Sequence, residues 1–375
     1  GAVLTIDLGA IRANYRFLQS KAPGARCGAA VKADAYGLGA IPVAAALAEE
    51  GCRHFFVAHL DEGIALRPHL PASAEIFVLH GPLPGTEAEF VAHGLIPVLN
   101  SAEQVAGWRD AARVLARRLP AVVQVDSGMS RLGLSPSEVD AWLADPGFLR
   151  GIDLRFLMSH LACAEQQDNP MNAAQLETFQ ALRRKLPQCP ASFANSSGIF
   201  LGPAFHFDIL RPGAALYGIA PVDGAPNPMR PVVTLQAKVI QTRVIERGDV
   251  VGYGASYRAP SRRRIATIGT GYADGWLRSL SARGFARVGS ARVPIVGKVS
   301  MDTLALDVTD LAPESVLPGA LVDLISAAQP VDEVAALAGT IGYEILTSLG
   351  ARYHRDYVDG APVVQARQES TEFSI

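Results

Sequence analysis

Residues 121–138 read Ala-Val-Val-Gln-Val-Asp-Ser-Gly-Met-Ser-Arg-Leu-Gly-Leu-Ser-Pro-Ser-Glu, and they contain a complete transition from a strand to a helix. The apolar, β-branched run at 121–126 is typical of a buried strand. Residues 135–138 form a capping box with proline at the first helical position, which predicts the start of a helix. A buried strand followed by a helix is the repeating unit of parallel α/β sheets.

The same alternation of apolar runs and helical stretches continues from the start of the chain to about residue 220. We expect eight strands, at residues 27–33, 54–58, 75–80, 96–100, 121–126, 152–160, 192–195 and 207–210. Eight such units in this length favour a (β/α)8 barrel of the TIM type. An open, doubly wound parallel sheet is the alternative that the pattern leaves.

The pattern changes after a proline-rich linker at 221–228. Alternating strands are expected at 234–245 and 292–308, with a helix near 331–338, so this part is mostly β. The sequence thus predicts an α/β chain in which residues 1–226 form the barrel and residues 227–375 form a C-terminal β domain. The first few residues are an exception, because they can pack with the second domain.

Composition narrows the class of protein. The 375 residues carry 36 acidic and 34 basic side chains, are 19% charged and 49% hydrophobic, and suit an enzyme with neither nucleic acid nor membrane as its partner. Apolar runs such as 40–48 are shorter than the roughly 18 residues that span a bilayer. The first eight residues lack the basic segment of a signal peptide, so we expect a cytoplasmic protein. The four cysteines are widely spaced, and no metal site is expected.

In such a barrel the functional residues lie at the carboxyl ends of the strands. The first expected strand delivers Lys32 there, followed by Asp34 and Tyr36. Burial lowers the pKa of a lysine and leaves a neutral amine that can attack a carbonyl, which is the chemistry of an aldolase or of pyridoxal phosphate. A lysine that simply extends to solvent is the plainer interpretation.

Later strands end in other polar groups. Ser196 and the backbone amides of Gly213 and Ala214 can bind a phosphate, because the loops after strands seven and eight often do so in barrels. His160 and Arg211 come at the ends of two other expected strands, so we expect both to project into the mouth of the barrel. A histidine there is often structural, whereas an arginine keeps its proton and needs a planar acceptor.

Six segments resemble, in the same order, those of the bacterial alanine racemases. The segments are 30–37 (Ala-Val-Lys-Ala-Asp-Ala-Tyr-Gly), 125–133, 211–218, 252–257, 268–276 and 297–302. The resemblance covers nearly the whole chain. It implies a pyridoxal-phosphate-dependent isomerase of fold type III that interconverts L- and D-alanine. It also implies a homodimer whose two active sites each contain residues of both subunits.

The resemblance also implies roles for individual residues. Lys32 would bind the cofactor covalently and act as the base for D-alanine, while Tyr253 of the partner subunit would be the base for L-alanine. The remaining cofactor-binding residues would be Tyr36, His160, Asn195, Ser196, Arg211, Gly213 and Ala214. The substrate-binding residues would be Arg131, Tyr272, Met301 and Asp302.

Two positions depart from the family pattern. Many members carry a carbamylated lysine where this sequence has Gln124, and we expect the neutral amide to accept a hydrogen bond from Arg131 instead. Some members use a tyrosine near the carboxyl end as a phosphate ligand, where this sequence has Ala351; Tyr353 is close but out of phase.

Three questions of function stay open. A racemase for serine or for a broad range of amino acids is the nearest alternative, and a cofactor carrier without turnover is a more distant one. The sequence does not decide whether D-alanine is supplied to peptidoglycan or consumed.

Overall fold

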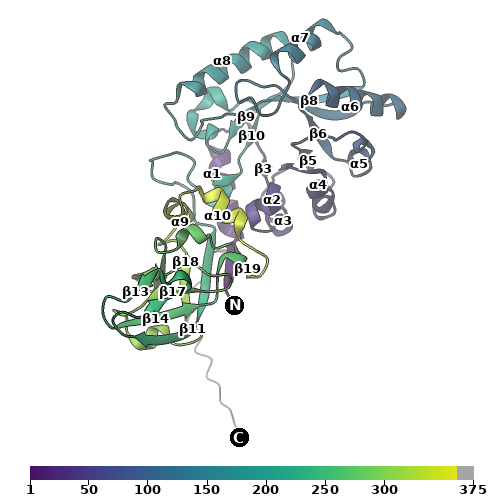
Figure 1. Ribbon diagram of the computed structural model, residues 1–375. Coiled ribbons are helices and arrows are strands. Elements are labelled where there is room, and N and C mark those ends of the chain that lie inside the picture. Colours follow the sequence, from purple (N-terminus) through teal and green to yellow (C-terminus); the bar gives the residue numbers. More distant parts are fainter. Residues whose placement is uncertain (361–375) are drawn as a thin grey trace.

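Nine short parallel strands form the sheet of the first lobe in the computed structural model, which describes residues 1–360 (Figure 1). They pair in the order β2-β10-β9-β8-β7-β6-β5-β4-β3. Their bounds are β2 Arg26–Cys27, β3 Ala29–Ala30, β4 His54–Val57, β5 Glu75–Val78, β6 Ile96–Leu99, β7 Leu119–Gln124, β8 Ile152–Met158, β9 Ala191–Asn195 and β10 Ile209–Arg211.

β2 and β3 stand at the two ends of this strand order, yet they are two halves of one stretch, separated by Gly28. The sheet therefore curves round until its two ends nearly meet. β2 pairs with β10, while β3 pairs with β4. A Cβ atom at Gly28 would lie 2.8 Å from the Phe56 ring and 2.9 Å from the His54 carbonyl oxygen, so glycine is needed where these segments approach. The predicted (β/α)8 barrel is confirmed as a nearly closed barrel, and the open doubly wound sheet is wrong.

Helices cover the outside of the barrel, and apolar side chains fill its centre. Phe56, Phe77, Phe156 and Met158 belong to this inner cluster. The covering helices are α1 Leu8–Ser20, α3 Ala40–Glu49, α4 Leu60–Leu66, α5 Glu87–Ala92, α6 Ala102–Val114, α7 Pro136–Ala144 and α8 Pro170–Lys185. The capping box at Ser135 starts α7 as predicted. Figure 1 shows α7 and α8 at the end of the molecule farthest from the second lobe.

The second lobe is the predicted β domain. Its sheet has the order β14-β17-β16-β15-β18-β11-β1-β19, and the long β11 also pairs with β14, which closes six of the strands into a ring. The strands are β1 Val3–Asp7, β11 Val233–Ile245, β14 Arg263–Ile268, β15 Phe285–Val288, β16 Ala291–Val296, β17 Leu304–Asp307, β18 Leu321–Ile325 and β19 His354–Val358, beside a separate pair, β12 Val250–Val251 and β13 Tyr257–Arg258. Two helices, α9 Val331–Ala338 and α10 Gly342–Ser348, pack beside the ring.

Two expected strands differ from the structure. The expected strand 292–308 is in fact β16 and β17, because residues 297–303 form a turn between them. The first barrel strand ends at Ala30 rather than at residue 33, because Lys32 begins the short segment α2, Lys32–Gly37. That turn and α2 both carry residues with proposed functions.

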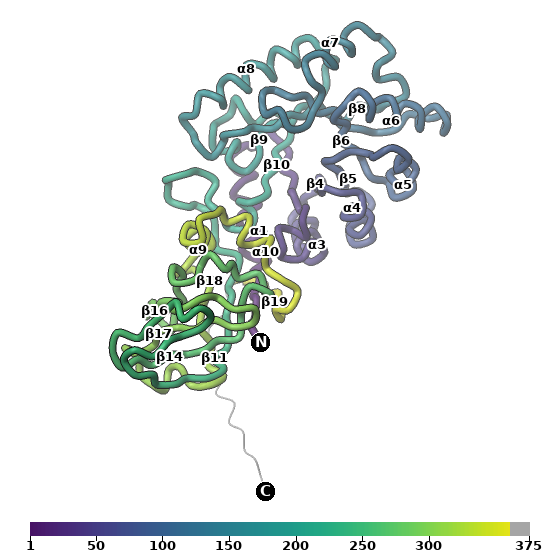
Figure 2. The backbone as a smooth tube through the Cα atoms, viewed as in Figure 1, coloured from purple at the N-terminus to yellow at the C-terminus, as the bar shows by residue number. Residues whose placement is uncertain are grey.

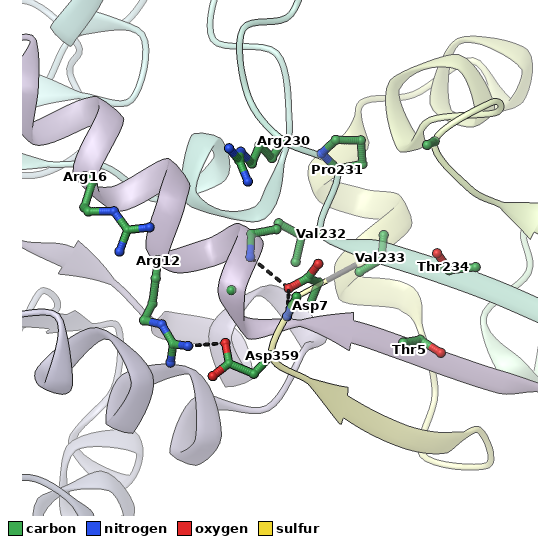
Figure 3. A pocket seen from close by; sticks show the side chains of 14 residues that line it. Thr5, Asp7, Arg12, Arg16, Arg230, Pro231, Val232, Val233, Thr234 and Asp359 are labelled. Atoms are coloured by element: carbon green, nitrogen blue, oxygen red, sulfur yellow. Dashed lines mark hydrogen bonds and ion pairs between the residues drawn. The ribbon is translucent and has the colours of Figure 1, made fainter. Parts of the chain in front are cut away.

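The two lobes meet where the first and last described strands run side by side. β1 pairs with both β11 and β19, although it precedes the barrel in sequence. A cavity of about 490 Å³ lies at this junction, where Arg12 of α1 forms an ion pair with Asp359 (Figure 3). Asp7 accepts hydrogen bonds from the backbone N–H groups of Ala10 and Gly360.

The helix α10 of the second lobe lies against α2 of the barrel. Figure 2 shows the yellow α10 beside the purple start of the barrel, so distant parts of the sequence lie together. Within residues 1–360, none of the helices has both the length and the apolar character that a membrane crossing requires.

Candidate active site

A cavity of about 720 Å³ opens at the carboxyl ends of the barrel strands. Its apolar part is formed by Phe56, Leu79 and Met158. Nine of the proposed site residues line it, namely Lys32, Tyr36, Arg131, His160, Asn195, Ser196, Arg211, Gly213 and Ala214, together with Gln124. The structure therefore brings together the barrel residues that the sequence singled out.

Lys32 enters the cavity from the start of an unusual turn. Ala33, Asp34, Ala35 and Tyr36 all have positive φ angles, between 52° and 56°, so α2 is a left-handed turn. Left-handed helical geometry costs roughly 1–2 kcal/mol per residue for L-amino acids, so tertiary contacts must hold it. Burial, and secondarily the charge of Arg131, lower the pKa of Lys32. A lowered pKa increases the fraction of neutral, nucleophilic amine.

One end of the cavity has the character of a phosphate site. The Ser196 hydroxyl oxygen accepts the backbone N–H groups of Gly213 (2.9 Å) and Ala215 (3.1 Å), so its own proton is available to another acceptor. A Cβ atom at Gly213 would lie 2.4 Å from the Tyr36 hydroxyl, so glycine is required for the phenol to sit there. The Tyr36 ring packs against Tyr217, with 4.8 Å between centroids.

Arg211 lies deep in the cavity and is 5% exposed. It donates hydrogen bonds to the Ser192 hydroxyl, to the Ser159 carbonyl at 2.7 Å and to Nδ1 of His160 at 3.2 Å. Burial lowers the pKa of Arg211 to about 9, which still leaves a cation at neutral pH. Its bonds use the two terminal nitrogens, and Nε has no acceptor among residues 1–360.

His160 is neutral at physiological pH. Burial and the positive charges of Arg211, Arg131 and Lys32 hold its pKa well below the usual value. Because arginine can only donate, Nδ1 of His160 is the acceptor of the bond from Arg211, and Nε2 then carries the proton. The histidine is thus a hydrogen-bond partner of Arg211 rather than a further cation.

The environment of Gln124 differs from our expectation. Its side-chain amide donates to the Leu132 carbonyl at 3.1 Å, and within the described residues it forms no hydrogen bond with Arg131. The amide therefore holds the backbone next to Arg131 and, within the described residues, does not hydrogen-bond the guanidinium. Arg131 itself is exposed and lines the open side of the cavity.

The second lobe contributes two lining residues that were not predicted from the sequence, Tyr343 and Thr347 of α10. The Tyr343 ring meets the Tyr36 ring edge-on, with 6.1 Å between centroids. Neither Ala351 nor Tyr353 lines the cavity; Tyr353 is buried and hydrogen-bonds the Thr270 hydroxyl. The sequence signal for Tyr343 was weak, because a short helix more than a hundred residues after the barrel gives no indication that it returns to the barrel mouth.

Four proposed residues lie elsewhere, on the surface of the β domain. Tyr253 is 72% exposed, Met301 53% and Tyr272 43%, and Asp302 is also exposed. A Cβ atom at Gly271 would lie 2.4 Å from the Met301 carbonyl oxygen, so the turns that carry Tyr272 and Met301 touch. None of these four residues is among the described residues that line the chain's own cavity, and exposed aromatic and methionine side chains are typical of interfaces.

The Asp302 carboxylate is fixed by an ion pair. Arg352 bridges Asp302 at 2.8 Å and the buried Asp274 at 2.7 Å. Within residues 1–360, no cluster of three or more metal-ligating side chains is present.

Family models match both lobes. Residues 6–221 match the model "Alanine racemase, N-terminal domain", and residues 232–357 match "Alanine racemase, C-terminal domain".

Individual relatives agree with the family models. A protein of Mesorhizobium japonicum named "Alanine racemase, catabolic" is 56% identical over 96% of this chain and 94% of its own length, and one of the same name from Agrobacterium fabrum is 52% identical over 95% and 92%. A crystal structure of alanine racemase from Bartonella henselae with covalently bound pyridoxal phosphate has a TM-score of 0.92 and 42% identity, and it covers 95% of this chain and 99% of its own.

Proposed function

This chain belongs to the alanine racemase family of pyridoxal-phosphate-dependent isomerases, and from that premise we propose that it interconverts L- and D-alanine with two bases on opposite faces of the substrate. The observation that carries the proposal is the convergence of Lys32, Arg211 and Ser196 in one cavity. An amine, a buried cation and a hydroxyl fixed by two backbone amides match the three polar ends of this cofactor.

The residues present fit the cofactor. Lys32 would hold it covalently, and Ser196, Gly213, Ala214 and Tyr36 would hold its phosphate. Tyr343 joins this set in our proposal, because its ring packs against Tyr36 beside Gly213. Bound pyridoxal phosphate supplies an electron-withdrawing ring that stabilises the negative charge developing at the α-carbon.

Arg211 sets the electronic character of the site. Its Nε–H would donate a hydrogen bond to the ring nitrogen of the cofactor and so keep that nitrogen unprotonated. The ring would then withdraw less negative charge from the α-carbon, which would disfavour transamination. Asn195 lines the same region, and its side-chain oxygen accepts the Gly198 N–H at 2.8 Å.

Two bases are needed because racemisation removes a proton from one face and returns it to the other. The Lys32 amine serves the face of D-alanine. The Tyr253 phenol of the partner subunit serves the face of L-alanine, since the chain's own Tyr253 is exposed on the β domain. Arg131 binds the substrate carboxylate together with the Met301 backbone of the partner subunit, while Tyr272 and Asp302 of the partner subunit line the approach.

This division of labour implies a homodimer with two composite sites. We place the boundary between the barrel and the β domain at residues 226 and 227, inside the exposed linker. We also place the enzyme in the cytoplasm, because all four cysteines are free thiols and free thiols are typical of that reducing compartment. Two relatives named catabolic favour consumption of D-alanine over supply to peptidoglycan.

The test is incubation of the loaded enzyme with L-alanine in deuterated water, followed by NMR of chirality and of deuterium at the α-carbon. Racemisation with deuterium in both enantiomers supports the proposal. Retention of chirality by alanine, with turnover of serine or other amino acids instead, would show that the substrate assignment is wrong.

A further inference from the structure

The carboxylate of Glu62 joins the turn that carries Lys32 to the neighbouring barrel strand. Oε1 of Glu62 accepts the backbone N–H of Ala33 at 2.6 Å. Oε2 accepts the N–H groups of Ala58 at 2.6 Å and His59 at 3.0 Å, at the end of β4. Both oxygens of one partly buried carboxylate are thus bonded to backbone donors from two segments, and bonds to an ionised acceptor are the stronger kind.

The left-handed turn needs such support at both ends. At its far end Arg355 donates to the Gly37 carbonyl at 2.6 Å, and Tyr357 donates to the Leu38 carbonyl at 2.9 Å. At its near end, the residue directly after Lys32 is held by Glu62. The carboxylate thus holds the peptide that directly follows Lys32.

We propose that Glu62 is a positioning residue for Lys32, which fixes the peptide after the lysine and places a negative charge beside its amine. The inference rests on the proposed role of Lys32 as the cofactor-binding base. Glu62 itself is absent from the residues that line the cavity, so it acts through Lys32.

The charges around Lys32 give this placement a measurable consequence. Burial and Arg131 lower the pKa of Lys32, whereas Glu62 raises it. His80 and His160 also face the amine, but burial lowers the pKa of each, so both are neutral near pH 7. Removing the negative charge of Glu62 would leave Arg131 unopposed, and the Lys32 amine would lose its proton more readily.

A simpler alternative is that Glu62 only caps its own helix, α4. Another glutamate of the chain provides a control for this alternative. Glu138 occupies the same third position of α7, where it accepts the N–H of Ser135 at 2.8 Å and reaches across to the N–H of Ala102 at 2.7 Å. It thus repeats the geometry of Glu62, but it bonds no residue of the lysine turn.

The experiment measures the reactivity of Lys32 in full-length protein. Wild type, E62Q, E62D and E138Q are freed of cofactor, treated with trace acetic anhydride from about pH 6 to about pH 10, and analysed by peptide mass spectrometry. Lys32 is separated from the other four lysines, Lys21, Lys185, Lys238 and Lys298. Cofactor release from the loaded proteins is followed in parallel.

We expect Lys32 of E62Q to react about three- to tenfold faster than wild type at pH 7, with its profile moved to lower pH. E62D keeps the negative charge, but its side chain is shorter. It should therefore release cofactor faster, while the pH profile of Lys32 reactivity stays as in wild type. E138Q should match wild type in both readouts. A turn that was merely loosened would expose the amine to water and move the profile to higher pH.

The proposal is overturned if E62Q shows the wild-type profile or a profile at higher pH. If E62Q does not fold, cofactor release from E62D at the wild-type rate overturns it instead. Acetylation of the cofactor-loaded wild-type protein distinguishes failure of this proposal from failure of the proposed function. If Lys32 holds the cofactor covalently, it must be protected from acetylation in the loaded protein. Free reactivity of Lys32 in the loaded enzyme would contradict the proposed function and not the contacts of Glu62.

Discussion

Lys32 is the residue on which the proposed chemistry depends most. We predict that K32A loses covalent attachment of the cofactor and at least about 10³-fold in activity, because among the described residues that line the cavity only Lys32 carries an amine. The measurement is the protein mass after borohydride reduction, with K185A, an exposed lysine of α8, as the control. Retention of cofactor mass on K32A would refute the assignment.

Gln124 has a different role from the one expected of it. Because its amide holds the Leu132 carbonyl, Q124A should raise KM about three- to tenfold through a less ordered Arg131, with little change in kcat. Q124K should stay close to wild type, since an ammonium group can donate to the same carbonyl. Steady-state kinetics decide this, and an unchanged KM in Q124A would show that the contact has no part in substrate binding.

Barrel residues of the cavity could be predicted because each lies at or near the carboxyl end of a predicted strand. Lys32, His160 and Arg211 all end or follow apolar runs, and barrel geometry then places them together. Tyr343 could not be predicted in this way, since its position depends on how α10 packs against α2. Separation of Tyr253 from the other tyrosines came from the family resemblance and not from the residues themselves.

The contact between α2 and α10 couples the lysine turn to the second lobe. Gly37 has a φ of 82°, and a Cβ atom there would lie 2.4 Å from the Leu346 carbonyl oxygen of α10. We predict that G37A loses about 2–4 kcal/mol of stability, from backbone strain and displacement of α10, and releases cofactor faster.

G51A is the matched control, because Gly51 also has a positive φ, of 96°, but open space around it. It should cost only about 1 kcal/mol and leave cofactor release unchanged. Urea unfolding and release kinetics of the two variants test the coupling. Equal effects of G37A and G51A would mean that only backbone strain matters.

Element boundaries were the weakest part of the prediction, for a physical reason. The apolar residues around Lys32 predict a strand. Residues 33–36 instead adopt a left-handed turn, which only tertiary contacts such as that of the Glu62 carboxylate make favourable. Residues 297–303 likewise interrupt a strand pattern with a turn. Local preference gives no signal for either.

At the scale of the whole molecule, buried histidines make stability depend on pH. Burial and the charges of Arg26 and Arg155 lower the pKa of His54 to about 4, and they outweigh the carboxylate of Glu75, 3.4 Å away. In the unfolded chain His54 titrates near 6.5. Its contribution is therefore present above about pH 6.5 and is lost as the pH falls towards 4.

We therefore predict that the melting temperature falls less steeply between these pH values in H54Q than in wild type. H93Q changes a more exposed histidine and should keep the wild-type slope. Parallel slopes for all three proteins would show that His54 does not control acid stability.

Both lobes were predictable because hydrophobic periodicity and turn residues report directly on βα units and on β strands. The expectation that two chains associate came only from the family resemblance, since the exposure of Tyr253 and Met301 is visible only in the folded structure. The central claim is that each site joins Lys32 of one subunit with Tyr253 of its partner.

Mixing two inactive variants tests this claim most directly. When K32A and Y253F homodimers are dissociated and reassociated in equal amounts, half of the dimers are mixed, and each of these contains one intact site and one doubly altered site. Our account predicts recovery of about one quarter of wild-type L-alanine racemase activity. A mixture with no more activity than the sum of the separate variants would contradict the composite site.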